Sequence, residues 1–379
     1  MNKTVYREAA KDLPVIADVD VLVVGGGPAG VCAAVGAARA GARTFLVERH
    51  GFLGGMWTAG MVLTLAGFNS WLRPYHRCVG GIAGEWIRRA AAQNGCQDHT
   101  GFVLNSDPEI MKRVADDLVT EAGVELLFHC WGADPICEDG VVKGLCIENV
   151  EGRQAIRATV TIDCTGDGDV MARAGAGWTK GQSLQPMTMS FRMGNLRIET
   201  DNDIHKPVSP PIGPEPGYLR EPTLSQYASV RQDVVVDADH MRAERESGRL
   251  PRYGGPWFGG LDADVIWVNS TRITGDASVA SDLTRAELAG RRETAEIVDY
   301  FVKHLPGFAA GRLIQTSTQI GIRETRRLEG VYTLKAADIL GRTDFDDGIA
   351  LGCWPIDVHP TTDAVGHHAM YVPLPYRIP

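Results

Sequence analysis

The stretch from Val19 to Gly30, VDVLVVGGGPAG, constrains the fold more than any other part of the chain. Its apolar first half indicates a buried strand, and its second half carries the G-x-G-x-x-G spacing of Gly25, Gly27 and Gly30. Glycine at these positions permits a tight turn, a close approach of the backbone to a diphosphate, and close packing of helix on strand. We therefore expect a parallel strand, a phosphate-binding turn and a helix in succession.

An alanine-rich helix is expected next, with Pro28 and Ala29 in its first turn, and then a second strand that ends just before Glu48. A diphosphate would lie on the free N–H groups at the start of that helix. A carboxylate at the end of the second strand accepts hydrogen bonds from ribose hydroxyls and repels a 2′-phosphate. The motif therefore favours NAD or FAD over NADP.

Composition limits the broad class of protein. A length of 379 residues accommodates two domains, and 44 % hydrophobic with 22 % charged residues is typical of an ordinary soluble globular protein. The net charge of −9 argues against a nucleic-acid groove. The scattered cysteines include no C-x-x-C pair and indicate reduced thiols in a cytoplasmic protein. With no signal peptide and no membrane-spanning window, we expect partners to include neither nucleic acid nor membrane.

A second glycine-rich stretch runs from Arg49 to Thr58, RHGFLGGMWT, and is too irregular for a helix or a strand. One interpretation is a plain surface loop. The other is a second backbone cradle for the phosphates of the same cofactor. The local pattern leaves both open.

Motifs along the whole chain are similar to a known family. The segments PVIADVDVLVVGGGPAG, ERHGFLGGMWTAGMV and IDCTGDGDV resemble those of bacterial FAD-dependent oxidoreductases of the glutathione-reductase-like flavoprotein superfamily. The pattern continues in VNSTRITG, LTRAELAGRRE, IGIRETRRLEG and WPIDVH, so the resemblance covers nearly the whole chain.

This resemblance implies non-covalent FAD and an α/β fold. A Rossmann-like FAD-binding domain with a parallel sheet, residues 1–184 and 311–379, would be interrupted by a mostly β substrate domain, residues 185–310. The implied cofactor-binding residues fall into groups for the pyrophosphate, the adenosine ribose, the flavin side and a turn that returns to the FAD site. They are Gly25, Gly27, Pro28, Ala29 and Gly30; Glu48 and Arg49; Gly54, Gly55 and Thr58; and Thr165, Gly166 and Asp167.

The first domain shows further local signals. Ser106 or Asp107 is expected to cap a helix that has Pro108 in its first turn, and Asp139-Gly140 is expected to form a hairpin turn. A buried strand over 160–164 precedes the turn TGDGD. Turn chemistry alone leaves two interpretations open. The segment is a plain Asp/Gly turn that binds no ligand, or it contributes to the FAD site. Because no histidine or further carboxylate completes a ligand set around its aspartates, we expect no metal.

The middle of the chain has a different pattern of apolar and polar residues. Apolar residues alternate with polar ones over 187–194 and again over 264–271, which indicates half-buried strands of an inserted sheet. Between them, residues 201–222 are too rich in proline for regular structure. Thr284 and Glu287 have the spacing of a capping box, which predicts a long helix from there to Leu305.

The last informative stretch contains the candidate catalytic residues. Arg323 and Arg326 belong to a dense charge cluster that is either a surface ion-pair network or a clamp for a substrate carboxylate or oxyanion. Asp357 lies two residues before His359, and the resemblance implies that this segment faces the flavin. His359 is therefore our candidate for proton transfer. The alternatives are His76, His367 and His368.

The sequence supports two hypotheses of different class. The first is an FAD-dependent oxidoreductase that transfers a hydride between a small organic substrate and flavin N5. The alternative is a non-catalytic flavin- or nucleotide-binding subunit that needs a partner to complete its site. Chains of the resembling family continue past the position of Pro379 with a further strand and helix. We therefore expect an open C-terminal edge, with a homo-oligomer or a partner chain as ways to complete it.

Overall fold

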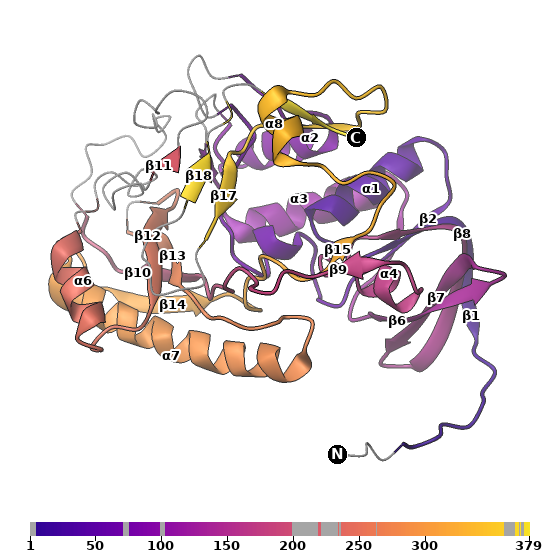
Figure 1. Cartoon of the computed structure of the whole chain (residues 1–379), viewed down its shortest axis with the longest axis horizontal. Helices are drawn as coiled ribbons and strands as arrows, with labels where there is room; N and C mark the ends of the chain where they lie inside the picture. The colour runs from indigo at the N-terminus through magenta and orange to yellow at the C-terminus, as the bar shows by residue number, and fades with distance from the viewer. Residues whose placement is uncertain are drawn as a thin grey trace.

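The computed structural model describes residues 5–70, 76–98, 103–198, 219–220, 234, 236–262, 264–359, 368–370, 372 and 375–379. Two sheets with their own helices lie side by side, and the C-terminal segment lies beside both (Figure 1). The predicted proline-rich loop over 201–222 lies outside the described residues, except for the short strand β11 (Leu219–Arg220).

The first sheet has six strands in the order β5-β2-β1-β8-β7-β6. β5, β2, β1 and β8 run parallel, which confirms the predicted parallel sheet, and the β6–β7 hairpin extends it in antiparallel fashion. The hairpin turns at Asp139-Gly140, as predicted. The strands are β1 (Val15–Val24), β2 (Thr44–Val47), β5 (Glu125–Leu127), β6 (Trp131–Glu138), β7 (Val141–Asn149) and β8 (Gly152–Asp163).

One face of this sheet packs against α1 (Pro28–Arg39), α2 (Gly81–Ala91) and α3 (Pro108–Glu121) around buried Leu46, Trp86 and Val114. Asp107 caps α3 by accepting hydrogen bonds from the backbone of Glu109 and Ile110, as the sequence predicts. The remaining elements of this half are short. They are η1 (Gly55–Trp57), α4 (Asp169–Arg173), the pair β3 (Thr64–Ala66) and β4 (Val103–Asn105), and β9 (Trp178–Thr179).

The second sheet is antiparallel, in the order β12-β13-β10-β14. The long helix α7 (Ala280–His304) and α6 (Ala238–Glu246) pack against it around buried aromatic side chains that include Phe191, Phe258 and Phe301. β14 pairs with β10, so this sheet includes residues beyond 310, where the sequence placed the return to the first domain. Its strands are β10 (Phe191–Gly194), β12 (Tyr253–Gly259), β13 (Ile266–Thr271) and β14 (Arg312–Thr316).

The predicted start of α7 is wrong. The helix begins at Ala280, and Thr284 lies inside it, donating its hydroxyl to the carbonyl of Ala280 at 2.9 Å. Glu287 is used in tertiary structure, because one carboxylate oxygen accepts from the backbone N–H of Ile320 at 2.7 Å. Thr284 and Glu287 therefore have the spacing of a capping box, but neither residue caps the helix.

The C-terminal segment forms small antiparallel units, and none of its described strands joins the six-stranded sheet. Its elements are β15 (Arg327–Leu328), which pairs with β9; α8 (Ala336–Gly341); β16 (Ala350–Gly352) with β19 (Tyr376–Ile378); and β17 (Ile356–Val358) with β18 (His368–Met370), next to β11. Among the described residues, no helix combines the length and the apolarity needed to cross a membrane.

Candidate cofactor and substrate site

The glycine turn between β1 and α1 has no space for a side chain at Gly25 or at Gly30. A Cβ on Gly25, whose φ is +102°, would lie 2.4 Å from the carbonyl oxygen of Cys164, and one on Gly30 would lie 1.8 Å from the carbonyl oxygen of Gly25. These contacts bring the start of α1 directly against the ends of β1 and β8. No side chain caps α1, so the first N–H groups of the helix are available to an anion.

The glycine-rich loop after β2 lies against this turn. Gly54, at φ +108°, donates its N–H to the carbonyl of Gly26 at 2.8 Å, and a Cβ on Gly55 would lie 2.7 Å from the Cα of Gly27. Thr58 donates its hydroxyl to the carbonyl of Leu53 at 2.7 Å, which stabilises the loop from inside. The arrangement has the form of the second backbone cradle, the alternative to a plain surface loop.

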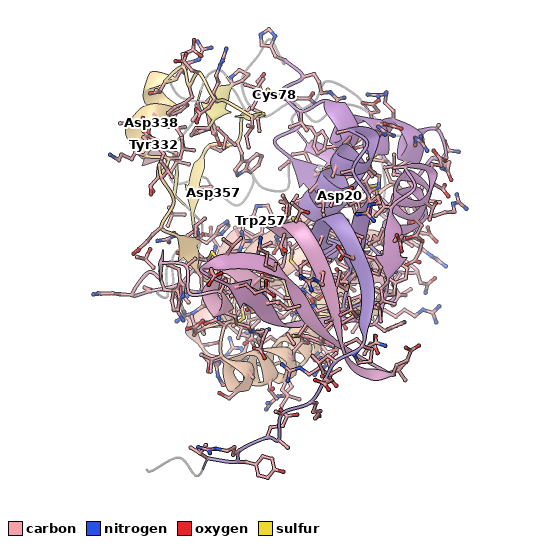
Figure 2. The ribbon with its side chains drawn as sticks, turned by 90° about the vertical axis from the view of Figure 1, so that its right-hand side faces the viewer. Asp20, Cys78, Trp257, Tyr332, Asp338 and Asp357 are labelled. Carbon is pink, nitrogen blue, oxygen red and sulfur yellow. The ribbon has the colours of Figure 1, made fainter. Side chains whose placement is uncertain are left out.

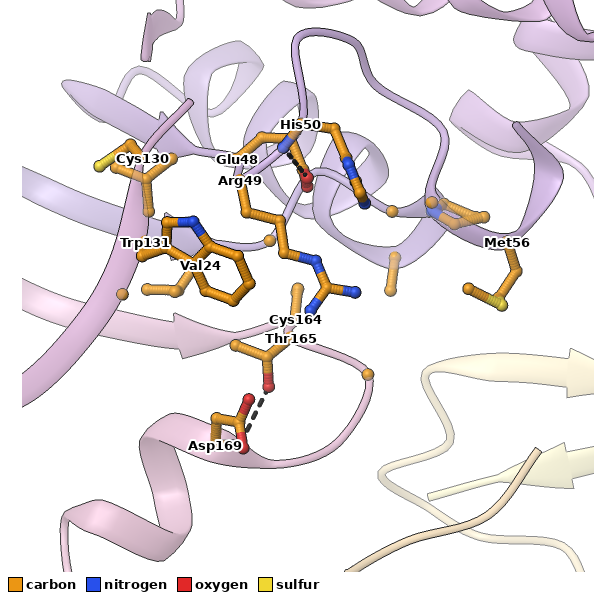
Figure 3. Close-up of a pocket in the computed structure, with 18 of the residues that line it drawn as sticks. Val24, Glu48, Arg49, His50, Met56, Cys130, Trp131, Cys164, Thr165 and Asp169 are labelled. Carbon is orange, nitrogen blue, oxygen red and sulfur yellow. Dashed lines mark hydrogen bonds between the residues drawn. The ribbon is translucent and has the colours of Figure 1, made fainter. Parts of the chain in front are cut away.

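Glu48 lies at the end of β2 and is oriented by the backbone. Its two carboxylate oxygens accept hydrogen bonds from the N–H of Gly26 at 2.6 Å and of His50 at 2.8 Å. The residue is only 6 % exposed, and it lines a pocket together with the glycine turn (Figure 3). The carboxylate is therefore held rigidly, with acceptor capacity left for ribose hydroxyls.

The pocket brings together most of the predicted cofactor residues. It is lined by the end of β1, the start of α1, the loop after β2 and the turn after β8. Gly30, Gly54, Thr58 and Asp167 do not line it. The predicted residues that do are Gly25, Gly27, Pro28, Ala29, Glu48, Arg49, Gly55, Thr165 and Gly166.

Sequence reasoning missed several residues of this pocket, among them Trp131 and Gln319, which both contact Arg49. The guanidinium of Arg49 lies over the ring of Trp131, 5.4 Å from its centroid, and extends toward the Thr165 turn (Figure 3). Gln319 accepts a hydrogen bond from Arg49, and its Oε1 also lies 2.9 Å from Nε2 of His50. Since Gln319 follows Arg49 by 270 residues, no local pattern indicated this contact.

The turn after β8 is built on Asp163. Its carboxylate accepts from the backbone and hydroxyl of Thr165, at 3.0 and 2.7 Å, and from the backbone of Met171 at 2.9 Å. Asp167 is held from outside by the hydroxyl of Thr325 at 2.8 Å, and burial raises the pKa of its carboxyl. The carboxylates of this turn thus have hydrogen-bonding roles. Among the described residues, no group of three or more His, Cys, Asp or Glu side chains could hold a metal.

Arg326 lies at this turn, apart from His359. Its Nη1 donates to the carbonyl of Asp167 and to Oδ1 of Asp169, both at 2.8 Å. Its guanidinium also lies 5.5 Å from the centroid of Trp178. The structure therefore uses Arg326 to connect residues 319–327 to the cofactor side.

A second polar cluster surrounds His359. Asp357 and His359 come from the end of β17, Arg272 follows β13, and Trp257 of β12 contacts the imidazole edge-on at 5.8 Å (Figure 2 labels Trp257 and Asp357). Nε2 of His359 lies 3.3 Å from Oδ2 of Asp357, and Nδ1 lies 3.4 Å from Nη2 of Arg272. Sequence reasoning missed Arg272 as a neighbour of the histidine.

The partners of His359 define its tautomer. A guanidinium can only donate, so Nδ1 accepts from Arg272 and the proton resides on Nε2, facing Asp357. Burial lowers the pKa of His359, and Arg323 and Arg272 act in the same direction, against the opposing effect of Asp357. The imidazole is therefore neutral near physiological pH.

Arg323 has an unusual environment for an arginine. Its side chain is exposed to water, yet the surrounding protein desolvates it and lowers the pKa of the guanidinium, partly offset by Asp357. In the described part of the chain it has no hydrogen-bond partner.

The segment 319–327 joins the two groups of residues. Its first residue, Gln319, contacts the cofactor pocket, and Thr325 and Arg326 bind the turn after β8. Between them, Glu324 accepts from the backbone of Gln185, whose side chain accepts from the backbone of His359. The pocket and the His359 cluster are therefore neighbours across this segment.

A family model described as FAD dependent oxidoreductase matches residues 20–379. The chain belongs to this family. FAD is its cofactor, and it is an enzyme of the oxidoreductase class. The glycine cradle, the free helix N-terminus and the oriented Glu48 fit the diphosphate and ribose of FAD.

Individual relatives match parts of the chain. It is 30 % identical over 200 residues to the thiamine thiazole synthase of Aeropyrum pernix, covering 49 % of this chain and 69 % of that protein. It is 28 % identical over 161 residues to the digeranylgeranylglycerophospholipid reductase of Methanoculleus marisnigri, covering 41 % of this chain and 40 % of that protein.

Among solved structures, a geranylgeranyl bacteriochlorophyll reductase-like protein from Thermoplasma acidophilum matches with a TM-score of 0.47 and 18 % identity. The match covers 80 % of this chain and 66 % of that one. The chain thus spans less than two thirds of that structure and less than half of the archaeal phospholipid reductase. The fold assignment rests on the strand order of this chain.

Proposed function

We propose that the protein transfers a hydride between a C–H bond of a small organic substrate and N5 of FAD. Bound FAD supplies the capacity to take up or release the hydride, and the chain supplies orientation, charge and a proton acceptor. The observation that carries the proposal is that Arg323, which has no hydrogen-bond partner among the described residues, interacts electrostatically with the His359–Asp357 pair beside the cofactor pocket.

Arg323 is proposed to bind an anionic oxygen of the substrate. A guanidinium remains charged even when its pKa is lowered, and it can donate two parallel hydrogen bonds. A desolvated cation without a hydrogen-bond partner gains most from an anionic ligand, because its lost hydration is then replaced. The same interaction stabilises negative charge that develops on a substrate oxygen.

His359 is proposed to take the proton that accompanies hydride transfer. Its neutral form carries the required lone pair on Nδ1, where Arg272 now donates at the long distance of 3.4 Å. A substrate anion that draws Arg272 toward itself would free this lone pair. Asp357 would act as a positioning residue, because it holds Nε2–H and stabilises the imidazolium that forms.

Arg326 is assigned a different role from the one expected from its sequence. Its bonds to Asp167 and Asp169 support a role in positioning the turn after β8 against the cofactor. Predicted residues that do not line the pocket, such as Thr58 and Gly54, are proposed to support it from behind.

Several finer assignments are part of the same proposal. They are non-covalent FAD binding, a place within the glutathione-reductase-like superfamily, a cytoplasmic location and an inserted substrate domain. The separate sheet β12-β13-β10-β14 with its own apolar core supports the inserted domain, and its extent would run to β14.

The test is anaerobic stopped-flow reduction of the bound flavin by a substrate found by screening carboxylate-bearing alcohols and amines. Loss of a positioned acid–base group costs about 10² to 10⁴ in rate, so His359→Ala should slow flavin reduction by that order with FAD retained. Arg323→Lys should raise the substrate concentration needed for half-maximal rate, because the ammonium group of lysine cannot donate the two parallel hydrogen bonds of a guanidinium.

Arg312→Lys, an exposed substitution on β14, is the matched control and should leave the rate unchanged. Flavin reduction at the parental rate in His359→Ala would remove the histidine from the reaction. Of the alternatives, His76 is then next, since His367 and the side chain of His368 lie outside the described residues.

A further inference from the structure

The motif VNSTRITG, which enters the proposed reaction only through Arg272, places side chains on both faces of the second sheet. It begins in the second half of β13, where successive residues point to opposite faces. Val268 belongs to the apolar core that α7 covers, and Ser270, on the same face, has 0 % exposure. Asn269 lies on the opposite face, together with Trp267.

The face that carries Asn269 is turned to the cofactor half. The indole N–H of Trp267 donates to the carbonyl of Met61, which follows η1 in that half. Arg192 of β10 pairs with Trp267 in register and therefore shares the face. Both Arg192 and Asn269 are only half-buried, whereas Val268 on the core face is fully buried. Packing between the two halves thus leaves parts of this face accessible to solvent.

Asn269 also lies close to the His359 cluster. It stands directly opposite Trp257 in the register of β12 and β13, so the two side chains share a face with their Cβ atoms about 5 Å apart. The ring of Trp257 contacts the imidazole of His359 edge-on at 5.8 Å (Figure 2 labels Trp257). Asn269 is therefore separated from the proposed proton acceptor by one side chain.

The carboxamide oxygen of Asn269 is buried, and it has no hydrogen-bond partner among the described residues. A buried acceptor in this state destabilises the protein, because its lost hydration is not replaced. The hydroxyl of Ser270 also lacks a partner among these residues, but it lies on the core face. Adjacent residues therefore carry an unpaired polar atom on each face of the strand, and only that of Asn269 is on the side of His359.

We propose that Oδ1 of Asn269 accepts a hydrogen bond from a hydroxyl or amino group of the substrate, in addition to the anionic oxygen assigned to Arg323. The inference rests on the proposed function, because that function places the substrate beside His359. A ligand without the donor would leave the oxygen unpaired, which is how a buried polar group excludes analogues that lack its partner. The substrate class is thereby narrowed to carboxylates that carry a hydroxyl or amino group.

The first test measures binding and needs no turnover. The FAD-loaded full chain is titrated with carboxylates in pairs that differ by one hydroxyl group, serine with alanine and tartrate with malate, and the change in flavin absorbance gives each dissociation constant. The parent protein should bind the member with the additional hydroxyl about 10- to 10²-fold tighter in at least one pair. Asn269→Leu should lose this preference, and the matched control Ser270→Ala should keep it.

Two results of the titrations would overturn the proposal. One is a parent protein with no preference in either pair, and the other is a preference that Asn269→Leu leaves unchanged. Failure of the proposed hydride transfer is a separate result, since it would appear as absence of flavin reduction while the binding preference persists.

The second test is urea unfolding of the FAD-loaded protein without any carboxylate. Leucine has nearly the volume of asparagine and removes the unpaired acceptor. Asn269→Leu should therefore unfold at a urea concentration at least as high as the parent, as expected for a residue that serves binding at the expense of stability. A lower unfolding midpoint, or failure of this variant to fold, would assign Asn269 a structural partner and overturn the proposal.

Discussion

At the residue scale, the sequence could predict those positions whose structural requirements are set locally. Gly30 is needed because the carbonyl oxygen of Gly25, five positions earlier in the motif, occupies the space of a side chain, and Gly25 is needed locally for its φ of +102°. Glu48 is found for a similar reason, since it ends the next strand. Gln319, Trp131 and Arg272 could not be found in this way, because each acquires its role from partners that only the tertiary fold brings near.

Two glycines of the same helix should respond oppositely to alanine. A Cβ on Gly30 would clash with the backbone oxygen of Gly25 at 1.8 Å, so Gly30→Ala should cost several kcal/mol, on the order of the ~3 kcal/mol of a severe core defect. Gly36 meets only the Cδ1 of Ile82, at 3.6 Å, and Gly36→Ala should gain up to about 1 kcal/mol from helix propensity. Urea unfolding of both variants checks this, and equal effects would refute the steric account of the turn.

His359 should make stability depend on pH. Its pKa is lowered in the folded state, chiefly by burial, below the ordinary value of 6.5. The contribution of neutral His359 to the free energy of unfolding is therefore complete above about pH 6.5. It is lost as pH falls from there through the pKa of the folded state. Urea unfolding at about pH 7.5 and about pH 5.5 should show a loss for the parent protein that is smaller in His359→Gln. The same loss in both proteins would assign the pH dependence to other groups.

At the scale of elements, the sequence predicted most strands and helices of the first sheet but mistook the start of α7. Thr284 and Glu287 satisfy the spacing of a capping box, and the competing use of Glu287, an acceptor for the backbone of Ile320, depends on a segment 33 residues away. The segment 319–327 could be identified as charged but not as a connector, because its partners Asp167, Gln185 and Arg49 come from three separate parts of the chain.

Glu293 on α7 should weaken the protein at alkaline pH. Burial raises the pKa of its carboxyl to about 7, helped by Glu296 and opposed by Arg252, and its Oε2 has no hydrogen-bond partner among the described residues. Because the folded pKa lies above the ordinary value of 4.5, the stabilisation from protonated Glu293 is complete below about pH 4.5 and is lost as pH rises through about 7.

The substitution Glu293→Gln removes that dependence. At about pH 8 it should raise the free energy of unfolding by up to about 3 kcal/mol, an upper bound from the size of the shift, and at about pH 5 it should change little. Asp299→Asn, at an exposed position of the same helix, serves as the matched control. A gain from Glu293→Gln that does not change between the two pH values would show that the carboxyl is not perturbed by burial.

At the scale of the whole molecule, residues of two sheets contribute to the proposed site. The parallel sheet could be predicted because its strands are near-continuous apolar runs, each followed by a helix or a turn. The extent of the second sheet could not, because β14 pairs with β10 across more than 110 residues and its pattern alone does not say which sheet it joins. The pairing of β14 with β10 places residues beyond 310 in the second sheet.

The central claim is that the turn from Gly25 to Gly30 and the loop at Gly55 hold FAD. Gly27→Asp tests it most directly, because a Cβ there meets only the Cα of Gly55, at 3.8 Å, so the fold tolerates the substitution while a carboxylate enters the place of the pyrophosphate. Ala40→Asp adds the same charge at the exposed far end of α1 and is the control.

The measurement is the flavin absorbance per protein after each purified protein is saturated with FAD and desalted. We predict that the parent protein and Ala40→Asp retain the flavin spectrum, whereas Gly27→Asp is colourless with an unchanged far-ultraviolet circular dichroism spectrum. A yellow Gly27→Asp protein with the flavin content of the parent would contradict the assignment of this site.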